Sequence, residues 1–270
     1  MGVLNVTPDS FSDGGRYLEP DKAVAHGREL VAEGADLVDV GGESTRPGAR
    51  RPSVEEELAR VVPVVEALVA EGVLVSVDTM RATVAERAVD AGAVLVNDVS
   101  GGRADPDMLD TVARLGTAYV LMHWRAHSNE MQQHATYGDV VDDVMRELRE
   151  QLDAADRAGL DPARGAVDPG IGFSKTADQN WDVLAGMERL HALGRPVLIA
   201  TSRKRFLGAL LADAHGEPRP PGLREDATTA TSALAALAGA WCVRTHSVRA
   251  TLDAVLVAQR WAAGAGGAGA

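Results

Sequence analysis

The sequence lacks several features that mark common classes of protein. A single cysteine, Cys242, excludes a framework of disulfides within the chain, and its place in an apolar run predicts a small buried thiol. Asp and Glu (39) outnumber Lys and Arg (27), and the net charge of −12 disfavours binding to nucleic acid or to an anionic membrane. No apolar run approaches the roughly 20 residues of a membrane span, and no signal-peptide pattern opens the chain. We therefore expect a cytoplasmic protein whose partners are small molecules.

What the sequence does contain is a series of short apolar runs, each followed by polar side chains. Val-, Ile- and Leu-rich runs without alternation are typical of parallel strands buried on both faces. Stretches of helical length separate the runs, and capping signals at Ser53, Asp139 and Thr176 mark helix starts. We therefore predict a single-domain (β/α)8 TIM barrel with its site at the C-terminal strand ends. The eight runs are Gly2–Val6, Leu37–Val40, Val73–Val77, Val94–Val96, Ala118–Met122, Gly165–Val167, Val197–Ala200 and Trp241–Val243.

The predicted barrel has long loops on the side where its site should lie. These loops cover Thr7–Leu18, Gly42–Pro52 and His123–Tyr137, and each is longer than a simple connection requires. After Trp261 the chain contains only Ala and Gly, which predicts a disordered tail. The expected organisation is one barrel domain over residues 1–261 and a tail over residues 262–270.

Cations gather at one rim of this acidic protein. Arg203, Lys204, Arg244 and His246 follow the last two runs, and Arg46 lies in a glycine- and hydroxyl-rich segment. A Gly-Gly pair alone would indicate only a tight turn, but the convergence of five cationic groups suits a polyanion such as pyrophosphate.

Acceptor side chains form a second group, which follows other runs. Asp78, Asn97 and Asp168 offer carboxylates and a carboxamide, the pattern needed to read the edge of an amino-lactam heterocycle. An alternative is that Asp78 caps the helix that follows it. The same alternative is weaker for Asp168, because the next helix is predicted to begin only near Thr176.

Eight motifs occur in order along the chain, one at each predicted strand end. They are MGVLNVTPDSFSDGG at 1–15, DVGGESTRPG at 39–48, VDT at 77–79, NDVSGG at 97–102, MH at 122–123, DPGIGF at 168–173, SRK at 202–204 and RTH at 244–246. Together they resemble the motifs of dihydropteroate synthase. The resemblance implies a homodimeric enzyme of folate biosynthesis, with Mg2+ as cofactor and sulfonamides as inhibitors. It also implies condensation of 6-hydroxymethyl-7,8-dihydropterin pyrophosphate with p-aminobenzoate to give 7,8-dihydropteroate and pyrophosphate.

The same resemblance implies roles for individual residues. The residues implied to bind the pterin are Asp78, Asn97, Met122, Asp168 and Lys204. Pyrophosphate is expected on Ser44, Thr45, Arg46, Arg244 and His246, beside Ser202 of the SRK motif, and Mg2+ on Asn5. The aminobenzoate ring is expected against Phe11, Pro47 and Phe173. The implied catalytic residues are Asp78, Lys204, Arg244 and His246.

Several alternatives stay open at this point. Many members of the family have Ser at the position of Arg205, so the group that binds the aminobenzoate carboxylate is undecided. His123, His127 and His134 suggest a zinc hydrolase, although histidines in a loop share no fixed face. A pterin-binding paralogue or a methyl-tetrahydrofolate transferase relative, without synthase activity, would retain Asp78, Asn97 and Asp168. It should not retain the cationic motifs as well.

Overall fold

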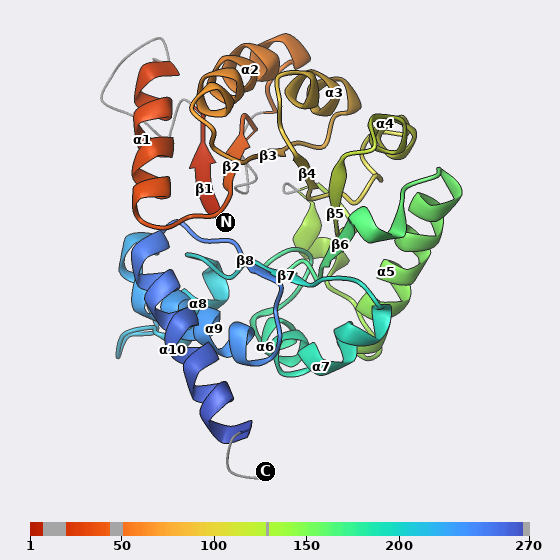
Figure 1. Cartoon of the computed structure of the whole chain (residues 1–270). Helices are drawn as coiled ribbons and strands as arrows, with labels where there is room; N and C mark the ends of the chain where they lie inside the picture. Colours follow the sequence, from red (N-terminus) through yellow and green to blue (C-terminus); the bar gives the residue numbers. More distant parts are fainter. Residues whose placement is uncertain (8–19, 44–50, 128–129, 267–270) are drawn as a thin grey trace.

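A computed structural model describes residues 1–7, 20–43, 51–127 and 130–266 of the chain. Its strands are parallel and alternate with helices, which form a ring around them (Figure 1). Each predicted run overlaps a strand, and β7 and β8 are only two residues long. The strands are β1 (Gly2–Asn5), β2 (Val38–Gly41), β3 (Val75–Asp78), β4 (Leu95–Asp98), β5 (Ala118–Met122), β6 (Gly165–Asp168), β7 (Leu198–Ile199) and β8 (Cys242–Val243).

The strands close into a barrel through two bridges. β1 to β6 form one sheet in sequence order, and β7 pairs with β8. Val167 of β6 bridges to Val197 before β7, and Gly2 of β1 bridges to Thr245 after β8. Backbone bonds support the second junction, since the Val3 amide donates to the Thr245 carbonyl at 2.9 Å. The predicted (β/α)8 TIM barrel is confirmed, and all strand ends with polar residues lie at one mouth.

Helices cover the outside of the barrel. The main helix of each connection packs an apolar stripe against the strands, and short 3₁₀ turns (η1 to η4) occur in the later loops. The α-helices are α1 (Pro20–Ala32), α2 (Val54–Ala70), α3 (Ala82–Asp90), α4 (Met108–Leu115), α5 (Val140–Arg157), α6 (Ala177–Ala185), α7 (Met187–Leu190), α8 (Arg205–Leu210), α9 (Glu225–Leu237) and α10 (Val248–Gly266). The 3₁₀ turns are η1 (Met131–His134), η2 (Pro162–Arg164), η3 (His191–Leu193) and η4 (Pro221–Leu223).

Capping side chains fix where three of these helices begin. Ser53 and Thr176 form reciprocal capping boxes at α2 and α6, and the Asp139 carboxylate accepts from the Asp142 amide at 2.9 Å at α5. Such caps satisfy amides that have no partner inside the helix. The three predicted helix starts are confirmed.

Alternating strand residues fill two separate layers. Val96, Tyr119 and Val167 belong to the large cluster between strands and helices, whereas Leu95 and Val120 belong to a smaller cluster. Because neighbouring strand residues face opposite sides, the smaller cluster is the filling of the barrel interior. Cys242 packs against this filling as a free thiol, and it is half-buried where the sequence predicted a buried residue.

The C-terminal region differs from its prediction. α10 continues to Gly266, so the expectation of a disordered tail from residue 262 is wrong for residues 262–266. The reason is that alanine has the highest helix propensity and extends a helix already anchored by packing. Residues 267–270 lie outside the described residues. Within the described part of the chain, none of the helices is long and apolar enough to cross a membrane.

Candidate active site

A cavity of about 930 Å3 opens at the carboxyl ends of the strands. It brings together residues at or just after all eight strand ends, although they are far apart in the sequence. The predicted site residues that line it are Asn5, Asp78, Asn97, Met122, Asp168, Phe173, Ser202, Lys204, Arg244 and His246. The predicted residues Phe11, Ser44, Thr45, Arg46 and Pro47 lie outside the described residues, and their roles stay predictions.

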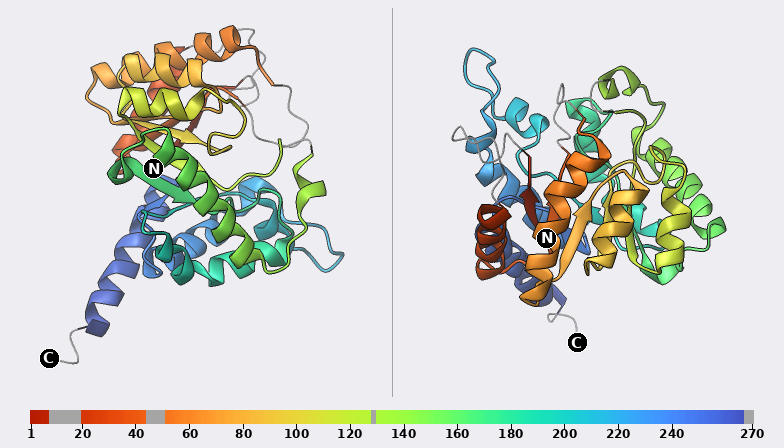
Figure 2. Two further views of the ribbon diagram at one scale, coloured as in Figure 1. Left: turned by 90° about the vertical axis from the view of Figure 1, so that its right-hand side faces the viewer. Right: turned by 90° about the horizontal axis from the view of Figure 1, so that it is seen from above.

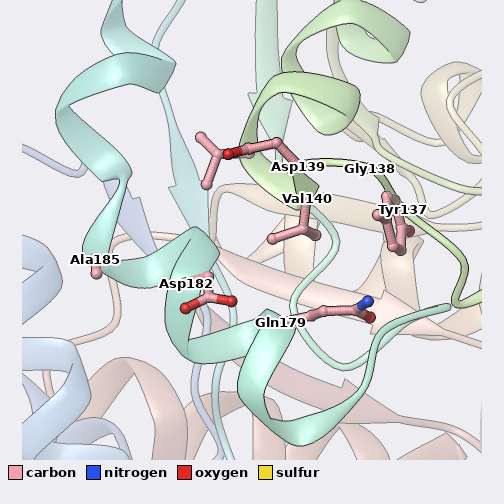
Figure 3. A pocket seen from close by; sticks show the side chains of 8 residues that line it. Tyr137, Gly138, Asp139, Val140, Gln179, Asp182 and Ala185 are labelled. Carbon is pink, nitrogen blue, oxygen red and sulfur yellow. The ribbon is translucent and has the colours of Figure 1, made fainter.

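A second hollow, of about 450 Å3, lies between the start of α5 and α6 (Figure 3). Tyr137, Asp139, Gln179 and Asp182 line it, and none of the predicted site residues does. Asp139 is already engaged as the cap of α5. The chemistry predicted from the sequence therefore belongs to the cavity at the barrel mouth.

Asp168 lies at the end of β6, where it is almost completely buried. Its Oδ1 accepts from the Gly170 amide at 2.7 Å, which fixes the carboxylate at the start of the following loop. Burial raises the pKa of Asp168, and the nearby Lys204 ammonium opposes that rise. Since α6 begins only at Ala177, Asp168 does not cap a helix, and the functional interpretation of this residue is favoured.

Asp78 and Asn97 belong to a buried polar network that the sequence did not predict. The Arg244 guanidinium donates from Nε to Asp39 Oδ2 at 2.6 Å and from Nη2 to Asp78 Oδ2 at 2.7 Å. Asn97 Nδ2 donates to the same Asp39 oxygen at 3.0 Å. The N-cap of α3 is Arg81, so the capping alternative for Asp78 is wrong.

Asp39 was missed as a member of the site, although the sequence contains a signal for it. It interrupts the apolar run of β2 and is fully buried, with Oδ1 lacking a hydrogen-bond partner among the described residues. An acid in the middle of a buried strand requires a cation. Arg244 is that cation. Although burial opposes the effect, Asp39 and Asp78 raise the pKa of Arg244.

Lys204 reaches into the cavity from the turn after β7. Its Nζ donates to the Ile171 carbonyl and lies 4.9 Å from the centre of the Phe173 ring. A Cβ on Gly172 would lie 2.8 Å from Lys204 Cδ, so glycine at this position gives the lysine its path. Burial lowers the pKa of Lys204 to about 8, although Asp168 opposes this fall. The lysine is therefore a cation whose charge is sensitive to pH near neutrality.

Ser202 and His246 are coupled across the ends of β7 and β8. Ser202 Oγ lies 2.9 Å from His246 Nδ1 and accepts from the His246 backbone amide at 3.2 Å. The two cationic motifs SRK and RTH are thus tied to each other at the rim. Their pairing places hydroxyl, imidazole and ammonium donors along the same wall of the cavity, an arrangement suited to an anion.

His123 does not support the zinc alternative. It is completely buried, with Nε2 2.9 Å from Glu147 and Nδ1 3.0 Å from the ammonium of Lys175. His134, by contrast, is exposed on η1. Among the described residues, no group of three or more His, Cys, Asp or Glu side chains is arranged to hold a metal ion. Lys175 also lines the cavity and was not identified from the sequence, because it lies outside the DPGIGF motif.

Asn5 ends β1 and lines the cavity. A carboxamide oxygen is a ligand that Mg2+ accepts, and this ion usually completes its shell with water and substrate phosphates. The residues present therefore fit a magnesium ion that arrives with a polyphosphate. They do not fit an all-protein metal site.

Polar and charged groups at the carboxyl ends of barrel strands, around one cavity, define an enzyme of the (β/α)8 class. The family described as "Pterin binding enzyme" matches residues 1–246. The chain belongs to this family and, within it, to the dihydropteroate synthases.

The similarity to individual members is extensive. The chain is 57% identical to the dihydropteroate synthase of Mycobacterium leprae (strain TN), over 97% of this chain and 92% of that protein. A solved structure of the Xanthomonas albilineans enzyme with 4-aminobenzoic acid is 47% identical, with a TM-score of 0.89 over 97% of this chain and 92% of that one. A Yersinia pestis dihydropteroate synthase in a sulfonamide drug complex has a TM-score of 0.90 at 39% identity, over 97% and 94% of the two chains. The resemblance seen in the strand-end motifs is confirmed.

Proposed function

We propose that this protein condenses 6-hydroxymethyl-7,8-dihydropterin pyrophosphate with p-aminobenzoate. The observation that carries the proposal is that one cavity is lined both by the acceptors Asp78, Asn97 and Asp168 and by the cations Lys204 and Arg244. The acceptors suit the amino and N–H groups of a pterin edge, and the cations suit a pyrophosphate. The Xanthomonas relative is known with 4-aminobenzoic acid, the second substrate of this reaction.

The reaction requires little acid–base chemistry from the protein. The neutral aromatic amine attacks the exocyclic carbon of the pterin, the C–N bond forms, and the bond from that carbon to pyrophosphate breaks. The amine then loses one proton. Binding the ring, neutralising the leaving group and excluding water therefore provide the catalysis.

The pterin ring is proposed to lie between Met122 and the acceptors. Met122 is buried and packs with Met80 and Val99 in a small apolar cluster at the barrel mouth, with Phe173 against it. This cluster offers an apolar surface, while Asp168 is oriented by the Gly170 amide. In this arrangement the edge of the heterocycle would form hydrogen bonds with the acceptors, and its face would pack on the apolar cluster.

The leaving pyrophosphate is proposed to bind Lys204, Arg244 and His246. Arg244 already uses two of its five donors on Asp39 and Asp78, so it is held in place before the substrate arrives. Asn5 would hold Mg2+, which supplies positive charge to the pyrophosphate when bound.

The aminobenzoate carboxylate is proposed to bind Arg205, beside Arg224. Arg205 is exposed and lines the cavity, whereas Arg224 is buried and donates to the carbonyls of Arg219 and Arg203. Burial and the neighbouring Arg205 lower the pKa of Arg224. In the described part of the chain neither guanidinium forms an ion pair, so an incoming carboxylate would meet two uncompensated cations.

Replacement of Arg205 tests this carboxylate site. Arg205→Ala should raise the KM for p-aminobenzoate about tenfold, the loss of one charge-assisted contact, and leave the KM for the pterin substrate unchanged. Arg157→Ala, an exposed arginine on α5, is the matched control. An unchanged KM for p-aminobenzoate in the Arg205 variant would place the carboxylate elsewhere.

We also propose that the protein is a homodimer formed through α9 and α10. These helices pack side by side, and the C-terminal part of α10 projects beyond the barrel (Figure 2). The apolar side chains exposed on the two helices are Leu234, Leu237, Leu256, Val257 and Trp261. Patches of this kind on a protein surface mark interaction sites. Analytical ultracentrifugation should show a dimer that Val257→Glu weakens, whereas a wild-type monomer would contradict the proposal.

The activity is tested by pyrophosphate release from the purified protein. Release should require both substrates and Mg2+, the product should have the mass of 7,8-dihydropteroate, and a sulfonamide should compete with p-aminobenzoate. Pterin binding without turnover would instead indicate the paralogue or methyltransferase alternative. Release that needs no p-aminobenzoate would indicate hydrolysis.

A further inference from the structure

Lys175 is one of only three lysines in the chain; it lines the cavity, and its side chain is almost completely buried. An ammonium group has three N–H donors, and three acceptors lie within hydrogen-bond distance of this one. Nζ lies 3.0 Å from the Gly170 carbonyl, 3.2 Å from the Phe173 carbonyl and 3.0 Å from His123 Nδ1. Because all donors of an ammonium group are engaged in this way, the lysine has none left for a substrate.

The acceptors of Lys175 connect it to two substrate-facing residues. Gly170 donates its amide to Asp168, and Phe173 forms part of the cavity wall. A Cβ on Gly170 would lie 2.3 Å from the His123 carbonyl oxygen, so this loop is pressed closely against the end of β5. Lys175 thus fastens the turn that holds the Asp168 carboxylate at one end and the Phe173 ring at the other.

A buried chain of polar groups holds the lysine from behind. His123 Nδ1 accepts from Lys175, so Nε2 carries the ring proton and donates to Glu147 at 2.9 Å. Glu147 in turn accepts from Arg125 at 2.6 and 3.0 Å. Burial and the Lys175 charge lower the pKa of His123 to about 4, which keeps the ring neutral and able to accept. This series of hydrogen bonds connects α5 to the loop after β6.

The backbone beside Lys175 is strained and needs such support. Ser174 has φ of +48°, a left-handed conformation that is unfavourable for a residue with a Cβ. Its carbonyl accepts from the Tyr137 hydroxyl at 2.9 Å, and the Tyr137 ring lies under the Arg125 guanidinium, 3.8 Å from it. The loop therefore keeps this shape because the groups around it impose it.

We propose that Lys175 is a positioning residue, which holds the loop after β6 so that Asp168 and Phe173 face the substrates. It acts through Gly170 and Phe173, and it is itself oriented by His123 and Glu147. This inference rests on the proposed function, in which Asp168 binds the pterin.

The test compares Lys175→Met with wild type and with Lys22→Met, an exposed lysine on α1. Pterin affinity is measured by calorimetry at a temperature where circular dichroism shows each variant fully folded. Lys175→Met should bind pterin about tenfold more weakly, and Lys175→Arg should recover part of that loss because it restores donors. Lys22→Met should behave as wild type.

Other outcomes would overturn the proposal. Wild-type affinity in folded Lys175→Met, with only a lower Tm, would make the lysine merely structural. Wild-type affinity with a reduced kcat would make it a participant in the chemistry.

If Lys175→Met fails to fold, Tyr137→Phe removes only the hydroxyl that holds Ser174. Affinity about threefold weaker would support the proposal, and wild-type affinity would overturn it. Failure of the wild-type protein to bind pterin would refute the proposed function itself, independently of any variant.

Discussion

The two sides of the barrel mouth are built in different ways. On the acceptor side, Asp78, Asn97 and Asp168 lie in the last two positions of four-residue strands within a continuous six-stranded sheet. On the cation side, Lys204 and Arg244 follow strands of two residues that pair only with each other in the shorter sheet.

Side-chain bonds replace the missing ladder on the cation side. The Arg203 amide donates to the Thr228 hydroxyl at 3.1 Å, and the hydroxyls of Thr201 and Thr231 lie 2.8 Å apart. The difference teaches that the proposed hydrogen bonds to the flat pterin ring come from side chains on a continuous sheet. On the proposed pyrophosphate side the charged groups follow short strands, and hydrogen bonds to α9 and to Asp39 and Asp78 hold that wall in place.

Arg244 connects the two sides, and its removal should have the largest effect. Arg244→Met leaves Asp39 and Asp78 buried without a cation, and we expect a loss of about 3–5 kcal/mol in the free energy of unfolding. Urea denaturation provides the measurement, with the exposed Arg157→Met as control. A loss below about 1 kcal/mol would show that the two sides are not coupled through this ion pair.

Asp168→Asn tests the acceptor side alone. Loss of one charge-assisted pair in a desolvated site costs about 1.5–3 kcal/mol, so pterin should bind at least about tenfold more weakly. Calorimetric titration with pterin measures this, and Asp182→Asn, exposed on α6, is the control. Unchanged affinity would remove Asp168 from the pterin site.

Lys204 tests the cation side through its pH dependence. Its pKa is lowered to about 8, so the group is charged below that pH and neutral above it. In the free enzyme kcat/KM should therefore fall above pH 8, by about tenfold per pH unit, as the charge that binds pyrophosphate is lost. Lys204→Arg should abolish this fall, because arginine stays charged. Lys204→Ala should reduce turnover while changing Tm little, and a large drop in Tm would indicate a structural role.

The loop after β6 should also show a stability-based pH effect, at Lys175. Burial lowers the pKa of this lysine from 10.5 to about 7 in the folded protein. Between these values the unfolded chain binds the extra proton, so the stability of wild type should rise with pH. Relative to Lys175→Met the slope should approach about 1.4 kcal/mol per pH unit, measured by denaturation from pH 7 to 10. Parallel curves for the two proteins would contradict the buried state of this lysine.

Features that depend on neighbours in the sequence were predictable. The apolar runs located the strands, because a segment buried on both faces must be apolar throughout. Ser53 and Thr176 located helix starts, because a cap acts within three residues. The motifs then gave the family and ten of the residues that line the cavity, although Lys175 was not among them.

The partners of those residues were not predictable in the same way. Asp39 and Arg244 are separated by 205 residues and meet only because the barrel closes between β8 and β1. Lys175 lies in the loop after β6. Its buried contacts come from His123, which follows β5, and through His123 from Glu147 of α5, and both residues are distant from Lys175 in the sequence.

The sequence by itself thus determined the order of strands and helices, the chemistry at each strand end and the family. Those properties follow from local periodicity and from residue types at fixed spacing. Only the tertiary structure decided which charges pair before substrate binds and which groups engage the buried ammonium of Lys175. Pairing and burial depend on distances between elements far apart in the chain, and these distances are fixed only when the barrel closes.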